Sequence, residues 1–194
     1  MPEQQDENLR IDFVGGAVGF RLRSGEGRGQ PLARAMGFKG GATPSVVDAT
    51  AGMGRDAFFL ASLGARVTLI ERSPEVHAAL ADAMDRARAH DEAFAAIMSR
   101  MTLLCGDSRQ LLATLSPEVV LVDPMHPERV KSALVKKNMR DLRDIVGADT
   151  DAPDLMVAAL AAATRRVVLK WPLRAEPIAG IRKPSHQILG KTTR

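Results

Sequence analysis

The 194-residue chain has few aromatic residues and almost no cysteine: no tyrosine, one tryptophan, six phenylalanines and a single cysteine. One cysteine excludes an internal disulfide and favours a reducing compartment. The position of Cys105 at the end of an apolar run predicts a buried, unreactive thiol. Because hydrophobic residues still make up 45% of the sequence, we expect a mostly aliphatic core.

Long apolar runs and a signal peptide are also missing. The longest apolar stretch, residues 155–163, is too short to cross a bilayer, and the first ten residues are polar and mixed in charge. We therefore expect a cytoplasmic protein with no membrane partner. The formal net charge of +4 permits a nucleic-acid partner without requiring one.

Beyond residue 40 the sequence alternates between short apolar runs and helical segments. Runs that are apolar throughout, such as residues 119–122, predict strands buried on both faces. Ser73 and Pro74 predict a helix start, with serine as the N-cap and proline in the first turn. The pattern predicts an α/β domain over residues 41–194, with a mostly parallel sheet and helices on both faces.

Residues 1–40 differ from the rest because they are rich in glycine and arginine. Residues 9–14 predict a short strand, 20–23 its hairpin partner, and 31–36 a short helix that ends at Gly37. We expect a small N-terminal appendage made of this hairpin, a loop and the helix. Its arginines are typical either of a solvated surface or of an electropositive wall beside the active site.

Acidic residues end or follow four successive predicted strands. They are Asp48, Glu71, Asp107 and Asp123. In an open α/β sheet, ligands bind outside the carboxyl ends of the strands, so we expect these side chains to lie near one ligand. Any single acid could simply cap a helix. Four together favour S-adenosylmethionine, whose ammonium, sulfonium, ribose diol and adenine amine offer donors or positive charge to all of them.

The first predicted strand is joined to its helix by a segment that contains Gly52 and Gly54. Glycines let a ligand approach the backbone closely. Residues 52–57 also fit the dinucleotide-binding pattern, and Glu71 follows at the expected distance, so an NAD-dependent oxidoreductase is an open alternative. Asp48 disfavours that alternative, because a carboxylate there repels a pyrophosphate and attracts the cationic end of S-adenosylmethionine.

The most informative segment is residues 123–127, Asp-Pro-Met-His-Pro, directly after an apolar run. A carboxylate and a proline at the tip of a buried strand form a rigid polar lip over a cleft. The segment resembles the Asp-Pro-Pro-aromatic signature of methyltransferases that modify exocyclic amines of nucleobases. We expect Asp123 and the Pro124 carbonyl to accept the two N–H groups of such an amine, while His126 stacks on the base. Trp171 is a second candidate for stacking, although ordinary packing also accounts for it.

The chain resembles the ribosomal RNA small-subunit methyltransferase J family from about residue 11 to about residue 190. The segments that carry the resemblance are 48–56, 71–72, 123–127 and, most specifically, the lysine-rich 131–137. The resemblance implies a class I methyltransferase fold that uses S-adenosylmethionine, yields S-adenosylhomocysteine and methylates N2 of a guanine in 16S rRNA or the small ribosomal subunit. The alternatives are an amino-methyltransferase for a DNA base or a protein glutamine, and a non-catalytic RNA-binding or ribosome-assembly protein on the same fold.

By position, the resemblance implies roles for further residues. Beside Asp48, Gly52, Gly54 and Asp123, the implied cofactor site contains Arg55, Asp56, Glu71, Arg72, Asp107 and Ser108. Glu71 would bind the ribose hydroxyls, and Asp107 with Ser108 would lie at the adenine. No metal is expected.

Three lysines beyond the Asp-Pro lip are candidates for contact with RNA phosphates. They are Lys131, Lys136 and Lys137, although a solvated charged face also accounts for them. The family usually has phenylalanine where this chain has His126, and its last strand would follow residue 193. We therefore expect a sheet that lacks its final strand.

Overall fold

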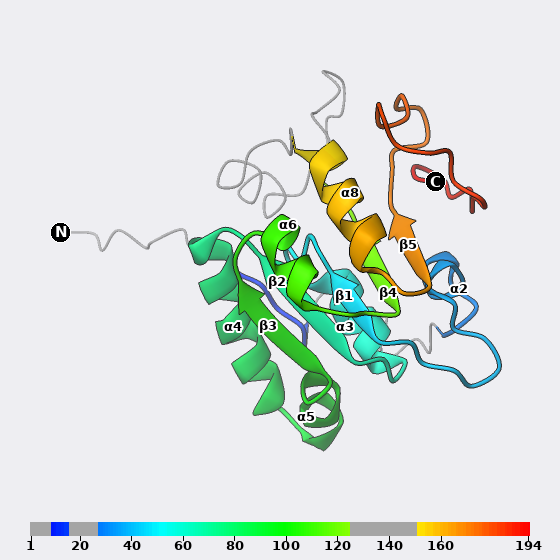
Figure 1. Ribbon diagram of the computed structural model, residues 1–194. Coiled ribbons are helices and arrows are strands. Elements are labelled where there is room, and N and C mark those ends of the chain that lie inside the picture. Colours follow the sequence, from blue (N-terminus) through cyan, green and yellow to red (C-terminus); the bar gives the residue numbers. More distant parts are fainter. Residues whose placement is uncertain (1–8, 16–26, 125–150) are drawn as a thin grey trace.

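The structure is a computed structural model, and it describes residues 9–15, 27–124 and 151–194. Five strands of these residues form one parallel sheet in the order β3-β2-β1-β4-β5 (Figure 1). They are β1 (Val46–Asp48), β2 (Val67–Glu71), β3 (Met101–Cys105), β4 (Val119–Val122) and β5 (Arg166–Leu169). The strand order reverses between β1 and β4, and such a switch point is where an open α/β sheet binds its ligand.

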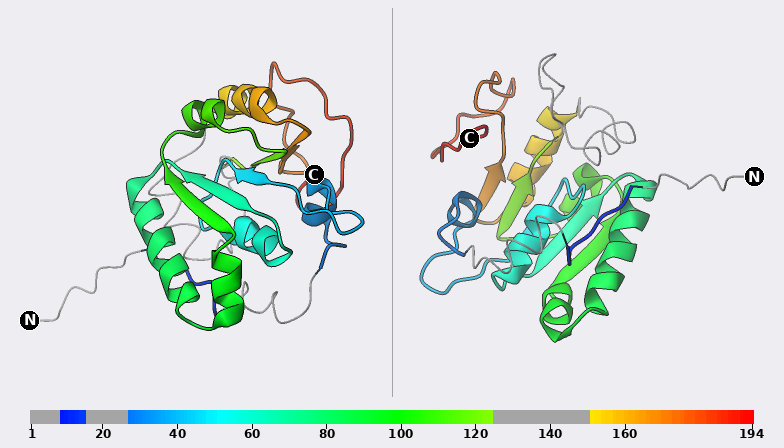
Figure 2. Two further views of the ribbon diagram at one scale, coloured as in Figure 1. Left: turned by 60° about the horizontal axis from the view of Figure 1, so that its bottom comes forward. Right: turned by 180° about the vertical axis from the view of Figure 1, so that it is seen from behind.

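Helices cover both faces of the sheet. They are α2 (Pro31–Met36), α3 (Arg55–Ser62), α4 (Pro74–Arg88), α5 (Glu92–Met98), α6 (Ser108–Leu111), the short 3-10 helix η1 (Leu112–Thr114) and α8 (Ala152–Ala162). Helices α3, α4 and α5 lie on one face and α6 and α8 on the other, as the two views of Figure 2 show. The α/β, Rossmann-like class predicted from the sequence is confirmed.

The apolar strands divide the core into two layers. In β4, Val119 and Leu121 pack with the α3, α4 and α5 layer, whereas Val120 and Val122 pack with α6 and α8. Side chains alternate between the two faces of a strand, so a strand covered by helices on both faces must be apolar at every position. The apolar run predicted this buried central strand.

Both helix-end predictions are confirmed. Ser73 caps α4 by accepting a hydrogen bond from the Val76 N–H, and Gly37 ends α2 with a φ of 88°. Asp107 is the N-cap of α6 and accepts the Arg109 N–H, and Ser108 is the first residue of the helix. The carboxylate of Asp107 is therefore already used by the fold.

The strand predicted over residues 9–14 is wrong. The Asp12 carboxylate accepts the N–H groups of Val14 and Gly15, which bends the chain locally instead of extending it. The apolar residues of this segment are nevertheless buried, and Phe13 stacks on Phe58 with 5.1 Å between ring centroids. The segment thus packs into the main core. Its proposed hairpin partner, residues 20–23, lies outside the described residues.

One prediction fails at an edge of the sheet. Cys105 is exposed, so the prediction of a buried thiol is wrong: β3 is an edge strand, and Cys105 is its last residue. At the other edge, residues 171–194 contain no strand beyond an isolated antiparallel bridge between Pro172 and Thr193. Within the described parts of the chain, no helix is both long and apolar enough to cross a membrane.

Candidate active site

Asp48 ends the central strand β1 and is the most deeply buried acid of the site, with 2% of its surface exposed. Its Oδ1 accepts a hydrogen bond from the Thr50 N–H at 3.2 Å. Burial, followed by the nearby carboxylates of Asp56 and Asp123, raises the pKa of Asp48 to about 7. Asp48 therefore sits in a place that favours either protonation or a positive charge beside it.

Glu71 ends the neighbouring strand β2 and is 5% exposed. Its Oε2 accepts the Gly52 N–H and its Oε1 the Ser73 N–H, each at 2.9 Å. Burial raises the pKa of Glu71, although these backbone donors and that of Arg72 oppose the rise. The carboxylate thus fixes the loop after β1 to the end of β2, where the predicted ribose contact would lie.

In the glycine loop between β1 and α3, backbone conformation and packing both require glycine. Gly52 and Gly54 have φ values of 50° and 66°, in the left-handed region that side chains rarely adopt. A Cβ atom on Gly54 would lie 2.8 Å from Leu80 Cδ1 and 3.0 Å from Phe13 Cζ. Gly54 is therefore required by the core beneath the loop, whatever ligand lies above it.

The residue that joins the predicted acids is Lys170, which sequence reasoning missed. Its Nζ lies 2.5 Å from Asp56 Oδ2, at the start of α3, and 2.5 Å from Asp123 Oδ2, after β4. The Lys170 N–H donates to the Val122 carbonyl, so the residue continues the ladder of β5. Burial lowers the pKa of Lys170, but the carboxylates of Asp123 and Asp56 outweigh it, and the pKa ends above its usual value.

Asp123 is held in place by its backbone as well as by Lys170. Its N–H donates to Thr50 Oγ1 at 2.7 Å, and the Thr50 N–H in turn donates to Asp48. Pro124, which follows, is buried. The structure thus brings the carboxyl ends of β1, β4 and β5 and the start of α3 together at the switch point.

Arg55, at the start of α3, is half-buried, and Asp56 beside it faces Lys170. His126 and the three lysines Lys131, Lys136 and Lys137 lie outside the described residues, so their predicted roles stay predictions.

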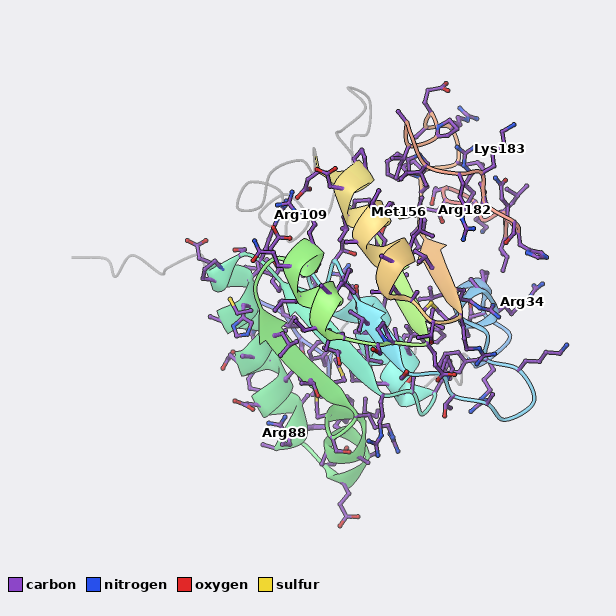
Figure 3. All side chains as sticks on the ribbon, in the orientation of Figure 1. Arg34, Arg88, Arg109, Met156, Arg182 and Lys183 are labelled. Atoms are coloured by element: carbon purple, nitrogen blue, oxygen red, sulfur yellow. The ribbon has the colours of Figure 1, made fainter. Side chains whose placement is uncertain are left out.

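A second group of charges lies beyond the ends of β2 and β3. Asp107 is bound by the Arg109 guanidinium, whose hydrogen bonds lower the pKa of Asp107. Asp151 lies 3.1 Å from Arg72 and 3.4 Å from Arg109, which Figure 3 labels. Asp151 directly precedes α8, so these pairs connect the strand ends to that helix. Arg109 and Asp151 were also missed, because pairs of residues distant in sequence leave no local pattern.

Two predicted residues have mainly structural contacts. Ser108 is 7% exposed and donates to the Ala49 carbonyl at 2.7 Å, which fastens α6 to the loop after β1. The Trp171 indole N–H donates to the Glu176 carbonyl at 2.8 Å. The adenine contact of Ser108 and the stacking role of Trp171 remain predictions.

The geometry suits a ligand that carries positive charge. Asp48, Asp56 and Asp123 place three carboxylates around one ammonium group, that of Lys170, and Asp48 has almost no access to water. This cluster of carboxylates fits an ammonium or a sulfonium group better than a pyrophosphate. Glu71 and the glycine loop next to it provide oxygen acceptors and close backbone approach. The residues present therefore fit S-adenosylmethionine.

Comparisons with known proteins give the same result over the whole chain. Residues 1–194 match the family model described as "Putative SAM-dependent methyltransferase". Ribosomal RNA small subunit methyltransferase J of Agrobacterium fabrum is 67% identical over 192 residues, covering 99% of this chain and 92% of the relative. The protein of that name from Brucella anthropi is 66% identical over 186 residues, covering 96% and 91%.

Among solved structures, a SAM-dependent methyltransferase from Neisseria gonorrhoeae has a TM-score of 0.71 and 31% identity, covering 98% of this chain and 73% of that one. A glycopeptide N-methyltransferase solved with S-adenosylhomocysteine has a TM-score of 0.52 at 18% identity, covering 88% and 59%. This second likeness concerns the fold alone. Both structures are methyltransferases, in agreement with the fold predicted from the sequence.

Proposed function

The chain belongs to the ribosomal RNA small subunit methyltransferase J family of S-adenosylmethionine-dependent enzymes, and we propose that it methylates the exocyclic N2 of a specific guanine in 16S rRNA. Membership of this family sets aside the oxidoreductase alternative. The proposal further places the enzyme in the cytoplasm, with 16S rRNA or the small ribosomal subunit as its partner.

The observation that carries the proposal is the position of Asp123 at the switch point, next to buried Asp48 and bound to Lys170. When bound, S-adenosylmethionine supplies an electrophilic methyl group on a sulfonium. Asp48, Glu71 and the glycine loop would hold it at the ends of β1 and β2. The guanine then needs only to be presented to that methyl group from the side of Asp123.

Asp123 and the Pro124 carbonyl would accept the two N–H hydrogens of the guanine amine. That amine is conjugated with the ring, so its lone pair is a poor nucleophile until the hydrogens are drawn out of the ring plane. Orientation of this kind supplies a large part of the acceleration. The carboxylate of Asp123 would also stabilise the positive charge that develops on the nitrogen as the S–CH3 bond breaks, and it is placed to take up the proton that the methylated nitrogen then releases. The base must leave its stack to reach this position.

Lys170 is a positioning residue in this scheme. Its ammonium group fixes one carboxylate oxygen of Asp123 and offsets the repulsion among Asp48, Asp56 and Asp123. Without it, three carboxylates within one small region would resist ionising together. The lysine thus holds the Asp123 carboxylate in a fixed orientation.

The proposal is tested with methyl-labelled S-adenosylmethionine and small ribosomal subunits that lack the modification. We expect label on N2 of one guanine of the 16S rRNA. Transfer to a DNA base or a protein glutamine instead would replace the substrate in this proposal. Cofactor binding without any transfer, to subunits or to naked 16S rRNA, would favour the non-catalytic alternative.

A further inference from the structure

The last 24 residues hold all of the net charge of the protein. Residues 171–194, which we call the C-terminal loop, contain five cationic side chains and one acidic one. The whole chain has 27 lysines and arginines against 23 acids, so the first 170 residues contain 22 of each and are formally neutral. A loop of net charge +4 on an otherwise balanced chain is a concentrated electropositive feature.

The neck of the C-terminal loop is closed by backbone pairing next to the active site. Trp171 follows Lys170 directly, and its N–H and C=O pair with those of Arg194 at 3.0 and 2.8 Å. The Arg194 guanidinium donates to the carbonyls of Leu173 and Ala175, which tightens the neck. Both ends of the loop therefore lie close in space to Lys170, the lysine that binds Asp123.

The middle of the C-terminal loop has apolar side chains that pack on the core and cationic side chains that face solvent. Ile178 and Ile181 pack against the core layer of α6 and α8. Arg182, Lys183 and Lys191 are exposed. The loop lies beside β5 and α8 in both Figure 1 and Figure 2, and Figure 3 shows Arg182 and Lys183 at the end of the molecule opposite to Arg88.

We propose that the exposed cations Arg182, Lys183 and Lys191 of the C-terminal loop contact RNA phosphates next to the target nucleotide. This inference rests on the proposed function and identifies a surface for its substrate. Exposed lysine and arginine side chains bind a phosphate backbone through charge without reading sequence. A loop that begins at Lys170 is placed to orient the strand on either side of a base presented to Asp123.

The test replaces the three cations together, as Arg182→Gln, Lys183→Gln and Lys191→Gln. The matched control removes three cations at the opposite end of the sheet: Arg66→Gln, Arg88→Gln and Arg100→Gln. Arg66 and Arg100 flank the amino ends of β2 and β3, and Arg88 ends α4. Both variants lose the same charge, so a general electrostatic effect would change them equally.

Binding of a single-stranded oligouridine is measured over a range of salt concentrations. We expect the slope of log affinity against log salt to fall by about 2 in the loop variant, since each lost phosphate contact removes about 0.7. The control should keep the wild-type slope. The exchange Arg182→Lys, Lys183→Arg and Lys191→Arg should restore binding, because phosphate recognition here depends on charge. An equal slope in loop variant and control would overturn the inference, as would absence of salt-dependent binding in the wild type.

The methyl-transfer assay separates this inference from the proposed function. In the loop variant, we expect the KM for small subunits to rise at least tenfold while kcat and the cofactor Kd stay unchanged. If the wild type transfers no methyl group but the difference in slope persists, the proposed function fails and the phosphate surface stands. If transfer proceeds with an unchanged KM in the loop variant, the surface is not used by the substrate and the inference fails.

Discussion

Lys170 of the active site and Trp171, where the C-terminal loop begins, are neighbours after β5, yet the two regions differ in charge. The site is mainly acidic and buried, whereas the loop is basic and exposed. In the site, Asp48 and Glu71 are almost fully buried and Lys170 joins Asp56 to Asp123. In the loop, four of the five cations are exposed and only one acid is present. Buried charges fix geometry because each needs a partner, whereas exposed charges act on distant phosphates. The two proposals therefore assign chemistry and substrate capture to two different regions of the molecule.

The largest effect should come from Asp123→Asn. The amide retains the size of the side chain and one oxygen that accepts hydrogen bonds, but it carries no negative charge to stabilise the charge that develops on the substrate nitrogen. We expect kcat to fall about 10³-fold, as for the loss of one key electrostatic group at other active sites. Titration calorimetry should show cofactor affinity within a few-fold of the wild type. Full activity in this variant would remove Asp123 from the chemistry.

Asp48→Asn tests how much the buried carboxyl group of Asp48 lowers the free energy of unfolding. Its pKa rises from 3.8 to about 7 on folding, so the folded protein holds a proton there that the unfolded chain has released between these values. Stability therefore decreases as pH rises from about 4 to about 7, by about 1.4 kcal/mol for each pH unit in that interval. The variant should be more stable than the wild type at pH 8 and similar at pH 4. Urea unfolding at both pH values measures this, and equal differences would contradict it.

Lys170→Met removes the cation but keeps the length of the side chain. Misplacement of a reacting group by about 1 Å can cost about 100-fold in rate, and we expect a loss of that order. Because the ammonium group of Lys170 lowers the pKa of buried Asp48, its loss should raise that pKa further, and the acid limb of the pH–rate profile should move to higher pH. Lys170→Arg should return the limb towards its wild-type position. An unmoved limb in the methionine variant would reduce Lys170 to a packing residue.

Gly54→Ala should have the smallest effect, and it should act on stability. The substitution imposes a left-handed φ on alanine and drives its Cβ against Leu80 and Phe13. We expect unfolding free energy to fall by about 1–3 kcal/mol. Gly40→Ala is the matched control, because its φ is 59° but nothing lies within 4 Å of the added Cβ. Equal losses in both variants would show that packing beneath the loop is unimportant.

Local patterns in the sequence predicted most of the fold. The alternation of apolar runs with helical segments predicted the parallel sheet, and Ser73 and Gly37 predicted helix ends, because each signal depends on residues close in the chain. The strand over residues 9–14 failed because its apolar residues pack on helices and Asp12 bends the backbone. The burial of Cys105 failed because the sequence does not show which strand lies at the edge of the sheet.

Of the charges that meet at the switch point, the acids were predicted and Lys170 was not. Acids at strand ends could be recognised one by one, since each follows its own strand. Lys170 could not be recognised in this way, because its role depends on contacts with Asp56 and Asp123, which are 114 and 47 residues away. The sequence did offer one signal for it: a lysine at the end of the last strand, where the other strands end in acids. Charge balance at strand ends is therefore a criterion to apply alongside motifs.

The most direct test measures initial rates of methyl transfer against small-subunit concentration for Asp123→Asn and for the loop variant side by side. We predict that Asp123→Asn lowers kcat and leaves KM near the wild-type value, whereas the loop variant raises KM and leaves kcat unchanged. If both variants change the same constant, the division between a chemical site and a phosphate-binding loop is contradicted.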